Sequence, residues 1–120
     1  MVAVEVLFFE GCPGYEPTLR LVREVAADAG VAAQIREVEI KSPEEAESLR
    51  FLGSPSVRIN GRDIEPGADE RTDFAYGCRV YGSGCMPPRA WLVAALEEVI
   101  LNEHNRHPCR ADVFLGPCID

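Results

Sequence analysis

The sequence has few basic residues and no long hydrophobic run. It carries 12 Lys and Arg residues against 20 Asp and Glu residues, a formal net charge of −8. A surface of this charge repels the phosphates of nucleic acids and anionic lipids, so we expect no nucleic-acid partner and no membrane partner. No stretch approaches the roughly 18 apolar residues that are needed to cross a bilayer.

The N-terminus lacks the basic start and the small-residue cleavage site of a secretory signal. We therefore expect a cytoplasmic protein, in a compartment that keeps thiols reduced. The five cysteines, an odd number, are then more typical of catalytic, metal-binding or buried thiols than of structural disulfides.

The length of 120 residues leaves room for one domain with one core, and no internal repeat is visible. We expect a domain over residues 1–102 that contains a long loop with cysteines over 65–87. A C-terminal tail with Cys and His residues is expected over 103–120.

Hydrophobic pattern and turn signals predict the order of the elements. Residues 2–9 are β-branched and aromatic apart from Glu5, which is typical of a strand buried on both faces. The further elements are predicted as a helix over 16–29, a strand over 34–40, a short helix that begins with a capping box at Ser42 and ends by Gly53, hairpin strands over 56–59 and 62–64 around Asn60-Gly61, and a helix from Pro88 towards Asn102. A β-α-β unit followed by a hairpin predicts an α/β fold, a small mixed sheet with helices on both faces.

Cys12 lies where the first strand ends and the following helix begins. The carboxyl ends of strands in an open α/β sheet are where chemistry is placed, and the positive end of a helix favours a thiolate over a thiol. Pro55, which follows a Gly-Ser turn and precedes a strand, is a candidate for a cis peptide bond.

The combination of Gly11-Cys12-Pro13 before a helix with Gly53-Ser54-Pro55 before a hairpin resembles the thioredoxin superfamily over about residues 2–102. The resemblance implies a thioredoxin-like fold, a redox-active Cys12 and a cis Pro55 packed against it. The chain departs from the Cys-x-x-Cys pattern of thioredoxins, because Tyr15 stands at the position of the second cysteine. Dithiol chemistry therefore needs a second sulfur from elsewhere in the chain.

A second resemblance lies downstream, in residues 51–66 and in Thr72-Asp73-Phe74 to Cys78-Arg79-Val80-Tyr81. These segments are similar to a group of short bacterial thioredoxin-like proteins that are often described as alkylmercury lyases. The resemblance implies cleavage of an organomercury compound as a candidate enzyme activity.

One or both of the loop cysteines, Cys78 and Cys85, are expected near Cys12. If Pro55 starts a strand beside Cys12, that strand runs away from the site and the next one returns, so the loop begins at the same end of the sheet. Long loops in compact domains are commonly functional, and the aromatic residues of this one favour an ordered lid. These aromatic residues are Phe74, Tyr76 and Tyr81.

Two chemistries fit three converging thiols. Cys12 attacks a disulfide or peroxide and a loop cysteine resolves the intermediate, which requires no cofactor. Alternatively, Cys12, Cys78 and Cys85 bind a soft metal ion such as zinc or mercury, although their spacing matches neither a zinc knuckle nor an iron–sulfur pattern. The expected partners are a small thiol, a disulfide or a metal-containing substrate, with a redox protein as reductant.

The remaining candidate residues have equally strong structural interpretations. Asp69, Glu70 and Asp73 would supply the proton that a lyase needs, but loop carboxylates are mostly solvated surface. The tail offers the zinc-type set His104, His107, Cys109 and Cys118, against the alternative of a loosely packed terminus. A catalytically silent scaffold that docks a basic partner is the further alternative.

Overall fold

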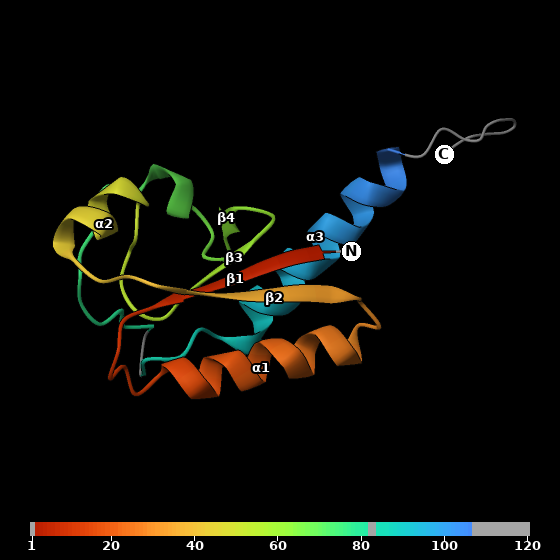
Figure 1. The fold of residues 1–120 in the computed structure, drawn as a ribbon. Coiled ribbons are helices and arrows are strands. Elements are labelled where there is room, and N and C mark those ends of the chain that lie inside the picture. The colour runs from red at the N-terminus through yellow and green to blue at the C-terminus, as the bar shows by residue number, and fades with distance from the viewer. Residues whose placement is uncertain (1, 82–83, 107–120) are drawn as a thin grey trace, which may run out of the picture.

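The computed structural model describes residues 2–81 and 84–106, and its centre is one mixed sheet with the strand order β2-β1-β3-β4 (Figure 1). Strand β1 (Val2–Phe8) pairs in parallel with β2 (Ala33–Glu39) and antiparallel with β3 (Ser56–Ile59). Strand β4 (Arg62–Asp63) pairs antiparallel with β3 and closes the hairpin. The predicted α/β fold with a small mixed sheet is confirmed.

Helices cover both faces of this sheet because side chains of β1 point alternately to opposite sides. Val4 and Val6 belong to a buried cluster that also contains residues of α1 (Tyr15–Asp28) and α3 (Arg89–Arg106). Leu7 points the other way, into a second buried cluster with Ala46 of α2 (Pro43–Ser48) and with Phe51. Strand β1 thus contributes apolar side chains to both buried clusters.

The local signals act as predicted at the hairpin. Asn60 and Gly61 both have positive φ, 52° and 86°, which is the conformation of a two-residue turn that matches the strand twist. The side chain of Asn60 also accepts a hydrogen bond from the backbone N–H of Ala3, at 3.1 Å. The turn is therefore attached to the neighbouring strand as well as to its own.

The start of α2 follows the capping signal, with one difference. The Ser42 hydroxyl accepts a hydrogen bond from the Glu45 N–H at 3.1 Å. The Glu45 carboxylate accepts from the N–H of Lys41 at 2.7 Å, one residue before the position that a capping box implies. The side chain still satisfies a backbone donor next to the helix start.

The last helix is longer than predicted. It continues past Asn102 to Arg106, so the expected boundary between residues 102 and 103 falls inside a helix. No glycine or proline interrupts the chain between Trp91 and Pro108. The residue before a proline disfavours the helical conformation. The signal that ends the helix is therefore Pro108, which lies later than the end that the hydrophobic periodicity predicts.

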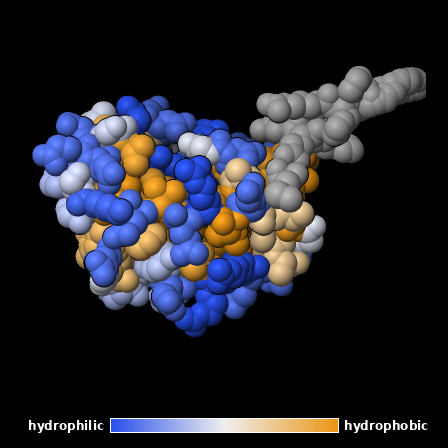
Figure 2. Space-filling view, in the orientation of Figure 1, coloured by the Kyte–Doolittle hydropathy of each residue, from blue (hydrophilic) through white to orange (hydrophobic). Residues whose placement is uncertain are grey.

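The long segment between β4 and α3 contains one short helical turn, η1 (Ala68–Glu70). It then runs back along the chain that precedes β3, where Ser54 and Cys78 form an isolated parallel bridge. The face shown in Figure 2 is mainly hydrophilic, with separate apolar patches between the charged residues. In the described part of the chain, no helix is long and apolar enough to cross a membrane.

Candidate functional site

Three chain segments meet at the carboxyl end of β1. The backbone N–H of Phe9, just beyond β1, donates to the Ser54 hydroxyl at 3.2 Å. The N–H of Ser54 donates in turn to the carbonyl of Gly77 in the long loop, at 2.7 Å. Ser54 therefore joins the end of β1 to the loop, as the topology argument required.

Cys12 lies in the turn between β1 and α1. Its side chain is buried, with 8 % of the residue exposed. Its carbonyl accepts from the N–H of Tyr15, the first residue of α1, at 3.3 Å. No side chain caps this helix end. The structure thus places Cys12 at the predicted junction between a strand and the beginning of a helix.

Cys85 lies directly against this turn. A Cβ atom added to Gly14 would come within 2.9 Å of the Cys85 Cβ and closer still to the Cys85 carbonyl oxygen. Such distances are too short for any side chain, so Gly14 is the residue that lets the Cys85 backbone approach. Cys85 thus contacts Gly14, which follows Cys12 by two residues in the chain.

Cys78 occupies a different place in the site. It is exposed and lies beside Ser54, where the N–H of the next residue, Arg79, donates to the Ser54 carbonyl at 2.9 Å. Among the described residues, Cys12, Cys78 and Cys85 are free thiols. His107, Cys109 and Cys118 lie outside the described residues; residue His104 lies within α3.

The Ser54–Pro55 peptide bond is cis, as predicted. The Tyr81 hydroxyl donates to the Pro55 carbonyl at 2.6 Å. Burial raises the pKa of the Tyr81 phenol above its ordinary value, an effect that the nearby positive charge of Arg79 only partly offsets. Tyr81 therefore stays neutral and remains a hydrogen-bond donor well above neutral pH.

The sequence did not predict a buried ion cluster centred on Arg79, whose side chain is 2 % exposed. Its guanidinium donates to both carboxylate oxygens of Asp63, at 2.8 and 3.0 Å, and to Glu65 at 2.7 Å. It also donates to the Ser56 hydroxyl at 2.9 Å and lies over the Tyr81 ring. The cluster anchors the loop to the hairpin.

Arg79 stays charged in spite of its burial. Burial disfavours the charged form, but the hydrogen bonds to Asp63 and Glu65 and the negative charge of Asp63 outweigh this effect, so the pKa of Arg79 is raised. One sequence signal pointed here: Asp63 and Glu65 are two residues apart in and just after β4, a spacing that places side chains on one face of a strand. The cation that these two carboxylates bind, Arg79, is determined by the tertiary structure and not by this spacing.

Two of the three acidic residues considered as proton donors form ion pairs with arginine residues. Asp69 pairs with Arg62 at 3.2 Å, and Asp73 with Arg71 at 2.6 Å, while Glu70 is exposed. The hydrogen bond from Arg71 lowers the pKa of Asp73 to about 2. Asp73 is therefore a carboxylate at neutral pH and has no proton to donate.

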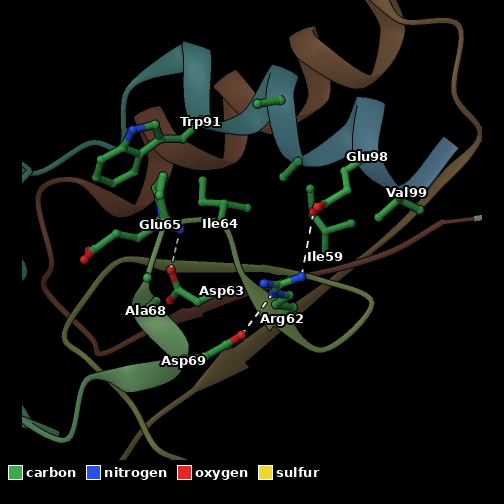
Figure 3. A pocket seen from close by; sticks show the side chains of 14 residues that line it. Ile59, Arg62, Asp63, Ile64, Glu65, Ala68, Asp69, Trp91, Glu98 and Val99 are labelled. Carbon is green, nitrogen blue, oxygen red and sulfur yellow. Dashed lines mark hydrogen bonds and ion pairs between the residues drawn. The ribbon is translucent and has the colours of Figure 1, made fainter. Parts of the chain in front are cut away.

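A groove of about 420 Å³ runs between β4, η1 and α3, apart from the thiols (Figure 3). Its floor is apolar, with Ile64 and Trp91, and Arg62 reaches towards both Asp69 and Glu98 at its edge. No cysteine lines it.

Within residues 2–81 and 84–106, no three His, Cys, Asp or Glu side chains are close enough together to hold a metal ion. In comparisons with known proteins, neither a protein-family model nor a curated protein matches the chain.

Proposed function

We propose that the chain is a thioredoxin-like protein that carries out thiol–disulfide exchange, with Cys12 as the attacking thiol and Cys85 as the resolving thiol. The element order, the cis Pro55 and the position of Cys12 before α1 support this arrangement. The observation that carries the assignment is the contact between Cys85 and Gly14. This contact brings a loop cysteine to the turn that carries Cys12, in a chain that has Tyr15 where the Cys-x-x-Cys pattern has its second cysteine.

The proposed reaction transfers two electrons from the dithiol to a substrate disulfide. The Cys12 thiolate attacks one sulfur, the S–S bond breaks, and the first thiolate leaves with its electron pair. The Cys85 thiolate then attacks the Cys12 sulfur of the mixed disulfide and expels the second thiolate. The product is a Cys12–Cys85 disulfide, which a thiol reductant, small or protein-borne, returns to the dithiol.

Cys85 is a better resolving thiol than Cys78 because of where each one is held. A disulfide needs Cα atoms within about 7 Å and side chains that face each other. Cys85 touches the same turn that carries Cys12, whereas Cys78 is held beside Ser54 by backbone hydrogen bonds on both sides of it. Pro55, which follows Ser54 through a cis peptide bond, undergoes no covalent change.

The test is to treat the reduced protein with a small disulfide and to map the products by mass spectrometry of peptides. Wild type should form a Cys12–Cys85 disulfide. Cys85→Ser should stop at a mixed disulfide on Cys12, and Cys78→Ser should form the same Cys12–Cys85 disulfide as wild type. A Cys12–Cys78 product would overturn the assignment of Cys85, and a Cys12 that never reacts would overturn the function itself.

The same variants separate exchange from the metal-binding alternative. A site that uses Cys12, Cys78 and Cys85 together would lose all three free thiols on addition of one equivalent of Hg(II), and each single Cys→Ser variant would weaken binding. Exchange chemistry predicts instead that Cys78→Ser leaves the reaction at Cys12 unchanged. Release of Hg(II) from phenylmercury in excess thiol would establish the lyase activity that the resemblance implies.

A further inference from the structure

The long loop of the chain itself pairs with the segment that precedes β3, next to the proposed site. The N–H of Ala75 donates to the Phe51 carbonyl at 2.9 Å, the N–H of Ser54 donates to the Gly77 carbonyl at 2.7 Å, and the N–H of Arg79 donates to the Ser54 carbonyl at 2.9 Å. The loop therefore runs beside residues 51–54 and uses both backbone hydrogen-bonding groups of Ser54.

This pairing is held by buried side-chain contacts rather than by the loop backbone alone. The Arg79 side chain is buried against Asp63 and Glu65. A Cβ on Gly53, whose φ is +116°, would lie 2.9 Å from the Arg79 Cβ, so the two backbones are in close contact. To free Ser54, the chain would have to expose a charged cluster that is bonded on several sides, which is unfavourable.

Three further contacts join the loop to the segments that carry Cys12 and Pro55. Cys85 lies against Gly14 on one side, and the Tyr76 ring packs against Phe9 edge-on, with ring centroids 5.5 Å apart. The Tyr81 hydroxyl, bonded to the Pro55 carbonyl, covers the start of β3. Cys12 is left with 8 % of its surface exposed.

We infer that the disulfide that reacts at Cys12 belongs to a small molecule and that extended polypeptides are excluded, an inference that rests on the proposed exchange function. An extended peptide binds a sheet by pairing with free backbone groups at an edge. At Ser54 those groups already pair within the chain. A small disulfide needs no such pairing, and it is itself the oxidant in the exchange.

The experiment compares two substrates with the same leaving group. One is the mixed disulfide of N-acetylcysteine with thionitrobenzoate, and the other is a peptide of about ten residues, long enough to form a strand, with the same mixed disulfide on its central cysteine. Both are reacted with the Cys78→Ser protein, because the exposed Cys78 would react with either one. Mass spectrometry follows the modification of Cys12. The rates at which glutathione reacts with the two substrates give their intrinsic rate ratio, and the rates at Cys12 are corrected by this ratio.

Relative to glutathione, Cys12 should react with the small substrate about tenfold or more faster than with the peptide, because the loop already lies beside Ser54, where the backbone of an extended peptide would have to lie. Equal corrected rates would overturn the inference while leaving the exchange function intact. A Cys12 that reacts with neither substrate would overturn both. The two failures are therefore distinguishable.

A variant tests the cause of the selectivity. In the Cys78→Ser background, Arg79→Ala removes the side chain that holds the loop and should raise the rate with the peptide. Arg89→Ala, which removes exposed ion pairs with Glu24 and Asp28 far from this cluster in the chain, should leave the rate ratio unchanged. If Arg79→Ala does not fold, the ratio measured with Arg79 in place still decides the inference.

Discussion

Asp63 accepts hydrogen bonds on both carboxylate oxygens from the guanidinium of Arg79, which lies 16 residues later in the chain. The first residue belongs to the hairpin and the second to the loop that carries Cys78 and leads to Cys85. This buried ion pair thus attaches the loop that carries Cys78 to the hairpin. Its consequences for stability and reactivity are measurable.

Arg79→Ala should destabilise the protein by about 3–5 kcal/mol, because it leaves buried carboxylates without their cation. Urea unfolding measures the loss. The control is Arg89→Ala, which removes an exposed pair with Glu24 and should cost less than about 1 kcal/mol. Equal losses in the two variants would show that the Arg79 cluster contributes no more than a surface ion pair.

Gly14→Ala should destabilise the fold by about 1–3 kcal/mol, the usual cost of overpacking, because its Cβ would overlap the Cys85 backbone. It should also slow formation of the Cys12–Cys85 disulfide after oxidation. Gly84→Ala is the matched control, since it lies next to Cys85 but has open space for a Cβ. A normal rate of disulfide formation in Gly14→Ala would contradict the proposed contact between the two thiol segments.

The protein should lose stability at alkaline pH through Tyr81. Its pKa is raised by burial in the folded state, while the unfolded chain ionises at about 10. The contribution of Tyr81 is therefore complete below pH 10 and is lost as pH rises above it, with a slope of about 1.4 kcal/mol per pH unit. Urea unfolding at pH 9, 10 and 11 should show a shallower decline for Tyr81→Phe than for wild type.

Asp73 should titrate at about pH 2, because Arg71 donates hydrogen bonds to its carboxylate. In Arg71→Gln the midpoint should return towards the ordinary 3.8. NMR of the carboxyl carbon measures both values. Since the folded-state pKa is lowered, the stabilisation from this pair is present above pH 3.8 and is lost as pH falls towards 2. An Asp73 midpoint that does not respond to the substitution would exclude Arg71 as its cause.

Local patterns in the sequence were sufficient for most of the fold. The apolar run of β1, the Asn60-Gly61 turn and the cap at Ser42 act over a few residues each, so each could be identified without knowing its neighbours. The end of α3 was misplaced because periodicity fades before the helix does. The continuation to Arg106 depends on the absence of a helix breaker rather than on a hydrophobic face.

The placement of Cys12 between a strand and a helix followed from short motifs in the sequence by itself, and the resemblance to the thioredoxin superfamily implied the cis Pro55. The positions of Cys78 and Cys85 did not follow from such motifs, because they depend on contacts with residues far away in the chain, and no local pattern encodes them. The tertiary structure placed Cys85 against Gly14 and Cys78 beside Ser54. It brought Asp63 and Glu65 to Arg79, where burial makes their charges hold the loop against the sheet.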